Sequence, residues 1–345
     1  DGTSAVSANI TQARSDGIFW VNSAGDYAER HWEGMYDGNE QNILHVWDGG
    51  AQTVNSIGLL ADAEYIEVYL SWDDWPVSNN NYDLFLMFYD GDSWEWINHS
   101  STVQSGFEPP VEKITHTTTL AAEYGFTIYN DQGTAEPRYF ELFSPTHDLA
   151  YHKQSSSIPN AGDAAGAFTV GAVSVADYSA SGFRAYSSQG PTNSVGGGAP
   201  DYENGGRIKP DIAAPDGVTT EAMGQFQGTS ASAPHAAGAA ALYASSYLDS
   251  NDVLPDPDQI QMYLEACADR VYDWGTDIDE IKNNEFGAGG LYMCDIPTGI
   301  VLQNFSAGSA APPGITLVLA GFLLCLACGL LSSSYSFFDI HKFHS

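Results

Sequence analysis

The chain has 345 residues and carries 44 acidic against 11 basic residues, which gives a net charge of −33. This excess of negative charge argues against a nucleic-acid partner, because phosphate backbones would repel it. A hydrophobic content of 43% with 12% aromatic residues disfavours an intrinsically disordered chain. The length is sufficient for one large α/β domain and a smaller second domain.

The N-terminal residues predict a helix followed by a buried strand. Val6, Ile10 and Ala13 recur at helical spacing. Residues 17–25 then form a nearly continuous apolar run that ends in small residues. Such a run is typical of a strand that is buried on both faces of a parallel sheet. The loop that follows, beginning at Asp26, lies at the carboxyl end of this strand, where α/β proteins place their active sites.

From residue 41 to residue 149 the pattern changes to short alternating strands that are separated by turn residues. Strands are predicted at residues 65–72, 82–88, 124–129 and 139–143. Together they indicate a small antiparallel β-sandwich. Asp73, Asp74 and Asp83 lie near its turns and offer the oxygen ligands that Ca²⁺ prefers. A structural Ca²⁺ site and ordinary turn aspartates both fit this pattern, and we favour turn aspartates because the whole chain is acidic.

A turn rich in glycine and small hydroxyl residues, residues 228–238, leads into an alanine-rich segment, residues 239–246. The alanine-rich segment predicts a helix with little side-chain bulk that packs tightly inside a larger body. Ser230 is expected at the N-terminus of this helix, where free backbone N–H groups and the helix dipole favour negative charge. This setting suits a serine nucleophile beside a carbonyl that becomes an oxyanion.

The motif Gly-Thr-Ser-x-Ser-x-Pro-His-x-x-Gly resembles the nucleophile motif of the subtilisin-like serine proteases (subtilases, peptidase S8 family). Seven positions match at fixed spacing, and Ser230 coincides with the nucleophile. Residues 166–173, 186–192 and 209–215 also resemble core segments of this family, in the family's order. The sandwich is similar to one inserted into the catalytic domain of some microbial subtilases. The resemblance implies a serine endopeptidase that acts on protein or peptide substrates and requires no cofactor for catalysis.

Asp26 departs from the family pattern. In subtilases the corresponding strand ends in Ala-Gly-Asn, and the asparagine amide donates a hydrogen bond to the oxyanion, whereas this chain has Ala-Gly-Asp. An ionised carboxylate offers no proton, so Asp26 can serve at this oxyanion-hole position only if it is protonated or assisted by backbone N–H groups. A slow or specialised protease, an inactive relative and a loop aspartate in a misaligned register are the three interpretations. We favour the first, since some prohormone convertases of the same superfamily also carry aspartate here.

The general base of the resembled mechanism is not found in the sequence. None of the nine histidines is followed by glycine, and neither Asp-Thr-Gly nor Asp-Ser-Gly occurs. His31, near Asp26, is expected to be a loop histidine that packs with Trp32 rather than the base, because the family takes its base from a His-Gly-Thr motif. We therefore expect an N-terminally truncated fragment, inactive alone, with the triad histidine and aspartate in a missing N-terminal half.

The C-terminal region predicts a membrane anchor. Residues 315–331 are seventeen uncharged, mostly apolar residues, at the lower limit for spanning a bilayer, and they follow a flexible spacer. A single-pass helix would place the enzyme outside the cell or at the cell surface, with Lys342 on the inner side. Outside this C-terminal region, the sequence has Cys267 and Cys294. They form either one disulfide in an oxidising compartment or two free buried thiols.

The expected fold class is α/β, with a three-layer subtilisin-like parallel sheet (the C-terminal half of a catalytic domain), an inserted antiparallel β-sandwich and a C-terminal transmembrane helix. The expected segments are the first part of the catalytic domain (1–42), the sandwich (43–150), the second part with the nucleophile (151–296), a linker (297–313), the transmembrane anchor (314–333) and a tail (334–345). The rival interpretation is a non-catalytic surface protein whose sandwich binds a carbohydrate or protein ligand. The sequence does not indicate the oligomeric state.

Overall fold

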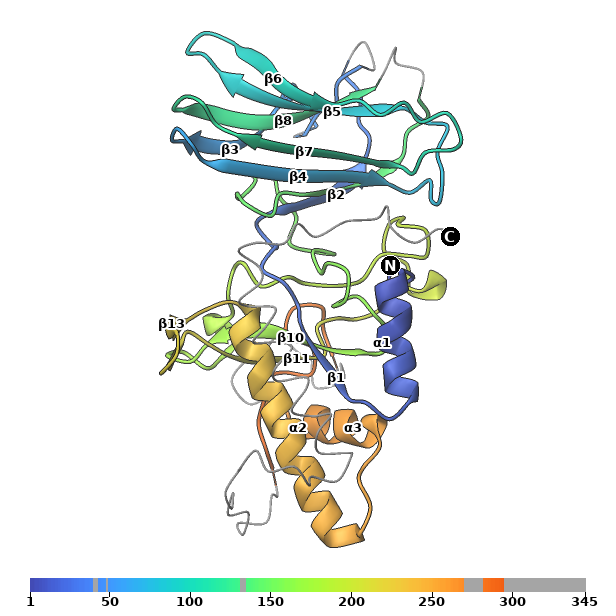
Figure 1. Ribbon diagram of the computed structural model, residues 1–345, viewed down its shortest axis with the longest axis vertical. Helices are drawn as coiled ribbons and strands as arrows, with labels where there is room; N and C mark the ends of the chain where they lie inside the picture. Colours follow the sequence, from blue (N-terminus) through green and yellow to red (C-terminus); the bar gives the residue numbers. More distant parts are fainter. Residues whose placement is uncertain (40–42, 48, 131–134, 270–281, 295–345) are drawn as a thin grey trace.

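The structure is a computed structural model that describes residues 1–345 except 40–42, 48, 131–134, 270–281 and 295–345. A β-sandwich forms one end of the molecule and an α/β body forms the other (Figure 1). The sandwich strands are β2 (His31–Met35), β3 (Asn55–Leu60), β4 (Tyr65–Trp72), β5 (Tyr82–Tyr89), β6 (Trp94–Ser100), β7 (Val111–Thr117), β8 (Ala122–Asn130) and β9 (Tyr139–Phe143). The body contains α1 (Ala5–Ser15), β1 (Trp20–Ser23), β10 (Ala167–Ser174), β11 (Ile212–Asp216), β12 (Val218–Thr220), β13 (Gly224–Phe226), α2 (Thr229–Asn251) and α3 (Pro257–Cys267).

The centre of the body is a three-stranded parallel sheet with the order β1-β10-β11. Seven of the eight residues of β10 are buried, which is the pattern expected of a strand covered on both faces. The predicted α/β fold with a parallel sheet is therefore confirmed. The helix predicted at the N-terminus is also confirmed, since α1 begins after Ser4, whose hydroxyl accepts a hydrogen bond from the Ser7 N–H at 3.0 Å.

Helices cover both faces of this sheet. Ala167 packs against Ile10 of α1, whereas the next residue, Phe168, packs with the alanines of α2. Successive side chains of a strand point to opposite faces, so α1 and α2 lie on opposite sides of the sheet and form three layers. The α2 side chains in this core are Ala233, Ala236, Ala239 and Ala240, whose small volume lets the helix backbone approach the sheet closely.

The sandwich is inserted in the sequence between β1 and β10. It consists of two four-stranded antiparallel sheets with the strand orders β2-β9-β4-β7 and β3-β8-β5-β6. In β4, buried and less buried residues alternate, and the buried ones, from Ile66 to Trp72, point into the core between the sheets. The predicted strands at residues 65–72, 82–88, 124–129 and 139–143 are all present. The sandwich begins earlier than residue 43, because β2 pairs with β9.

A disulfide joins Cys267, at the end of α3, to Cys294. The sequence left open whether these cysteines form a disulfide or stay free thiols, and the structure has the disulfide. The N-cap of α3 is Asp256, whose carboxylate accepts a hydrogen bond from the Gln259 N–H at 2.8 Å. The disulfide ties α3 to the segment that closes the α/β body.

The predicted fold class is wrong in its C-terminal transmembrane helix. Among the residues that the structure describes, no helix is long and apolar enough to cross a membrane. The prediction rested on seventeen residues, at the lower limit of what spans a bilayer, so apolar composition alone was a weak indicator. The segments expected at 297–313, 314–333 and 334–345 lie outside the described residues.

Candidate active site

The candidate site lies where the carboxyl ends of parallel strands meet the N-terminus of α2. Asp26 follows β1 closely, and Asp216 is the last residue of β11. Between these two aspartates lies the start of α2, with Gly228 as its N-cap and Thr229 as its first residue. Both carboxylates accept backbone hydrogen bonds from this helix start, where N–H groups have no partner within the helix.

Gly228 is required by the geometry of the turn before α2. Its φ of 102° lies in the region that side chains disfavour. A Cβ atom built at Gly228 would lie 2.6 Å from Asp26 Oδ2, which is closer than van der Waals contact allows. Its N–H donates to Asp216 Oδ1 at 2.8 Å. The glycine of the motif thus lets the chain pass directly beside Asp26.

Asp26 is joined to the first residue of α2 by two hydrogen bonds. Its Oδ1 accepts from the Thr229 N–H and from the Thr229 hydroxyl, each at 2.9 Å. The Thr229 hydroxyl also accepts the Gly25 N–H at 3.0 Å. These contacts connect the end of β1 to the start of α2 across about two hundred residues of sequence, so the predicted neighbourhood of Asp26 and the serine motif is present.

The protonation of Asp26 follows from its surroundings. Burial raises the pKa of Asp26, the bonds from Thr229 oppose the shift, and the nearby charge of Asp216 adds to it. Since Oδ1 already accepts two hydrogen bonds, Oδ2 is the oxygen that carries the proton whenever the carboxyl group is protonated. Oδ2 has no hydrogen-bond partner in the described part of the chain. A protonated Asp26 therefore has an O–H that is free to donate.

Ser230 is the second residue of α2, and it is exposed. Within the described ranges, no hydrogen bond joins its Oγ to a histidine or a carboxylate. His235, five residues on, bonds the Ala231 carbonyl at 2.8 Å through Nδ1. His31 lies in the sandwich and bonds Glu141. The structure thus brings Ser230 and Asp26 to one helix terminus, and none of the described residues is placed there as a base.

Asp216 belongs to this site, although sequence analysis did not single it out. It is fully buried and accepts hydrogen bonds from Arg184 Nε at 2.6 Å and from the Tyr186 hydroxyl at 2.5 Å, in addition to the Gly228 N–H. The available signal was its position directly after the apolar run of β11, at the same sheet edge as Asp26.

The aspartates that were considered as Ca²⁺ ligands accept hydrogen bonds from other groups of the protein. Asp73 Oδ1 accepts the Tyr139 N–H at 3.0 Å, and Asp74 Oδ2 accepts from Ser78 Oγ at 2.7 Å and from Asn80 Nδ2 at 2.9 Å. In the part of the chain that the structure describes, these aspartates do not gather as a metal-binding group with Asp83. Ca²⁺ binding at these positions therefore stays a prediction.

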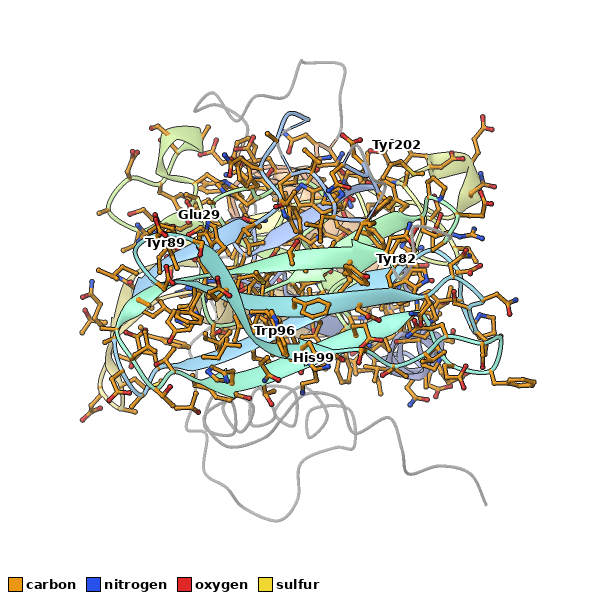
Figure 2. All side chains as sticks on the ribbon, turned by 90° about the horizontal axis from the view of Figure 1, so that it is seen from above. Glu29, Tyr82, Tyr89, Trp96, His99 and Tyr202 are labelled. Atoms are coloured by element: carbon orange, nitrogen blue, oxygen red, sulfur yellow. A yellow bond between two sulfur atoms is a disulfide. The ribbon has the colours of Figure 1, made fainter. Side chains whose placement is uncertain are left out.

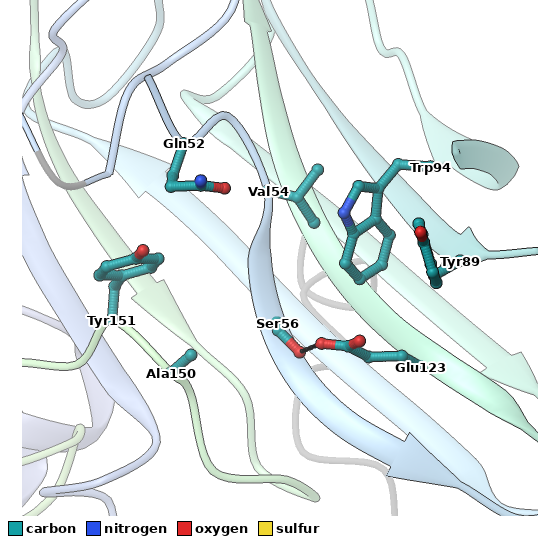
Figure 3. Close-up of a pocket in the computed structure, with 8 residues that line it drawn as sticks. All are labelled: Gln52, Val54, Ser56, Tyr89, Trp94, Glu123, Ala150 and Tyr151. Carbon is teal, nitrogen blue, oxygen red and sulfur yellow. Dashed lines mark hydrogen bonds between the residues drawn. The ribbon is translucent and has the colours of Figure 1, made fainter. Parts of the chain in front are cut away.

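A separate cavity of about 290 Å³ opens at one end of the sandwich sheet that contains β3, β5, β6 and β8 (Figure 3). Its lining residues are Gln52, Val54, Ser56, Tyr89, Trp94, Glu123, Ala150 and Tyr151. Ser56 Oγ donates to Glu123 Oε1 at 2.6 Å, so the carboxylate is held at the wall of the cavity. Aromatic rings and one fixed carboxylate suit a small polar ligand with apolar faces.

The comparison with protein families decides the family. The model of the subtilase family matches residues 89–289, more than half of the chain. The chain belongs to the subtilase family. This match confirms the resemblance that the serine motif carried. No curated protein sequence matches this subtilase at a significant level.

One solved structure agrees at the level of the fold. The structure of the Clostridium perfringens CspB protease aligns with a TM-score of 0.53 and 16% identity, over 84% of this subtilase and 62% of that chain. The subtilase described here thus spans less than two thirds of the CspB protease. The crystal structure of a lanthipeptide protease aligns with a TM-score of 0.26 and 18% identity, over 38% and 40% of the two chains.

Proposed function

We propose that this chain carries the nucleophile part of a subtilisin-like serine endopeptidase. Ser230 Oγ attacks the carbonyl carbon of a peptide bond, and a histidine outside the described residues takes its proton. The observation that carries the proposal is the exposed Ser230 at the N-terminus of α2, beside Asp26. A subtilase family match alone does not assign residues, so each role rests on this geometry.

The developing oxyanion is stabilised at the start of α2. The Ser230 backbone N–H is one of the orphan donors of the first helical turn, and the helix dipole favours negative charge there. The Asp26 Oδ2–H is the second donor while the carboxyl group is protonated. Removing one such donor in subtilisin, itself a subtilase, lowers the rate roughly 10²–10³-fold, so the state of Asp26 governs the rate.

Labelling with a fluorophosphonate probe tests this proposal. The native full-length protein is expected to be labelled, and Ser230→Ala is expected to abolish labelling. Ser245→Ala is the matched control, because Ser245 is an exposed serine of the same helix, and it should label normally. Equal labelling of Ser230→Ala and the native protein would refute Ser230 as the nucleophile.

The disulfide between Cys267 and Cys294 supports a location outside the reducing cytoplasm. Secretion of the protein to an oxidising compartment is therefore part of the proposal. Fractionation of the source cells, with detection of the oxidised protein, tests it. Recovery of only the reduced protein, in the cytoplasmic fraction, would contradict it.

A second candidate function is ligand binding by the sandwich. The cavity lined by Tyr89, Trp94, Tyr151 and Glu123 is the observation that favours it, because aromatic faces and a fixed carboxylate are suited to sugar rings (Figure 3). Figure 2 also shows Trp96 and His99 over the outer sheet of the sandwich. Glycan-array binding that Trp94→Ala abolishes, in a protein that no serine probe labels, would favour this function.

A further inference from the structure

Three metal-ligating side chains meet between the sandwich and the α/β body, away from the candidate active site. His31 and Glu33 lie two residues apart on β2, so their side chains share one face of the sheet. Glu33 is paired directly with Glu141 across the antiparallel ladder of β2 and β9. One ligand atom from each of the three side chains lies within 4.8 Å of the others.

This cluster is buried and sets two carboxyl groups against one imidazole. His31 is fully buried, Glu33 is 4% exposed, and the Glu141 side chain is 12% exposed. Like charges directly opposite each other in a sheet are destabilising, and burial increases the cost. Burial and then the charge of Glu141 raise the pKa of Glu33, against the opposing effects of His31, Tyr139 and Ser155.

One carboxylate oxygen in the cluster lacks a partner. Ser155 Oγ donates to Glu33 Oε1 at 2.9 Å, and the Tyr139 hydroxyl also acts on this carboxyl group. Among the described residues, however, the buried Glu33 Oε2 has no partner at hydrogen-bond geometry. Asn193 Nδ2 donates to Glu141 Oε1, which leaves Glu141 Oε2 facing His31. An unpartnered buried carboxylate oxygen costs free energy that a bound cation would recover.

The hydrogen bond of His31 Nδ1 fixes which ring nitrogen of His31 carries a hydrogen. His31 Nδ1 lies 3.0 Å from the Lys153 carbonyl oxygen, which can only accept, so Nδ1 carries a hydrogen. Nε2 lies 2.7 Å from Glu141 Oε2. Nε2 therefore holds either a proton or a lone pair that faces a cation. A histidine whose far nitrogen donates to a backbone carbonyl is the usual arrangement of a metal ligand.

We propose that His31 Nε2, Glu33 Oε2 and Glu141 Oε2 bind one divalent transition-metal ion, with Zn²⁺ as the probe. Two carboxylates and a neutral imidazole balance the charge of a divalent ion, whereas a protonated His31 leaves one buried negative charge. One nitrogen and two carboxylate oxygens suit Zn²⁺ better than Ca²⁺, which prefers oxygen alone. Lys153, Ser155 and Asn193 belong to the chain beyond the sandwich, so the ion would stabilise the junction between sandwich and body.

Isothermal titration of the chelator-treated protein with zinc chloride tests the site. An excess of Ca²⁺ in the buffer occupies weak sites on the acidic surface. One Zn²⁺ per chain is expected to bind and to raise the melting temperature. Glu33→Gln and Glu141→Gln are each expected to weaken binding at least tenfold, on the order of what disturbing a metal site costs.

The matched control is Glu64→Gln. Glu64 also lies beside a histidine of the sandwich, 3.5 Å from His147 Nε2, but it is 42% exposed and outside the cluster. This variant should bind Zn²⁺ like the native protein. Without metal, Glu33→Gln should melt no lower than the native protein, because it removes a buried like-charge pair, so lost binding is distinguishable from unfolding.

X-ray absorption spectroscopy of the Zn²⁺-loaded native protein gives a test that needs no variant. Nitrogen and oxygen ligands with an imidazole signature are expected. Sulfur ligation, a shell of oxygen alone, native-like binding by Glu33→Gln, or no stoichiometric binding by the native protein would each overturn the proposal.

Discussion

Asp26 Oδ1 accepts both the backbone N–H and the hydroxyl of Thr229 at 2.9 Å, so a single oxygen joins the end of β1 to the start of α2. This leaves Oδ2 as the protonation site and as the oxygen next to Gly228. The asparagine of the wider family has an amide that donates at any pH. Under the proposed mechanism, the same donation in this chain depends on a proton on Asp26, so the activity should depend on pH.

The first prediction is that Asp26→Asn makes the full-length enzyme faster, above all at alkaline pH. Burial raises the pKa of Asp26, so the donating acid form persists above the usual range of an aspartate and is lost as pH rises through the folded pKa. The variant keeps its donor, and its kcat should exceed that of the native enzyme at high pH by up to roughly 10²-fold. Profiles of kcat against pH with a peptide substrate check this. A variant that is slower than the native enzyme at every pH would contradict it.

The second prediction concerns the turn before α2. Gly228→Ala should destabilise the protein by about 1–3 kcal/mol, because alanine at φ 102° is strained and its Cβ would meet Asp26 Oδ2. Gly238→Ala is the matched control: Gly238 lies inside α2 with open space around it, and alanine there should stabilise by about 1 kcal/mol. Urea denaturation of both variants measures the difference. Equal stability of the two variants would show that the turn is not strained by a side chain.

Sequence analysis located the α/β body and the serine motif because their signals are strong. Strands such as β10 are apolar along their whole length, and α2 combines a glycine turn with a run of alanines. The alternation in β4 likewise predicted its bounds correctly. In these segments the buried positions are apolar, so the local sequence pattern predicts the secondary structure.

The sequence did not reveal β2 or Asp216. β2 was missed because two of its buried positions are His31 and Glu33, and a pattern search takes buried polar residues for a loop. Their burial depends on Glu141, more than a hundred residues away. Asp216 is buried because Arg184 and Tyr186 compensate its charge, and no local pattern indicates such partners.

The third prediction concerns the disulfide between Cys267 and Cys294, which are separated by 27 positions. Replacing both cysteines by serine should lower the free energy of unfolding by about 3 kcal/mol, because the unfolded chain gains freedom. Differential scanning calorimetry of the variant and of the native protein measures this. Reducing agent should lower the melting temperature of the native protein and leave the variant unchanged. An identical response of both proteins to reductant would contradict the prediction.

The fourth prediction concerns Asp211, a buried carboxylate between two lysines. Its Oδ2 accepts from Lys209 Nζ and its Oδ1 accepts from Lys282 Nζ at 2.9 Å. Burial alone would raise the pKa of Asp211, but the two lysines hold it below the usual value. Asp211→Asn removes the counter-charge of the buried Lys209 and one of the two carboxylate partners of Lys282, the other being Glu265, so it should destabilise the protein by about 3–5 kcal/mol.

Acid titration and a surface control make this prediction specific. A depressed folded pKa means that the contribution of Asp211 is fully present above the unfolded pKa of about 4 and is lost as pH falls through the folded value. Asp258→Asn removes an exposed partner of Arg14 and should change stability by less than about 1 kcal/mol. Urea midpoints between pH 3 and pH 7 should converge for Asp211→Asn and the native protein only at the acid end. A constant difference across this range would show that Asp211 stabilises the sheet through its shape rather than its charge.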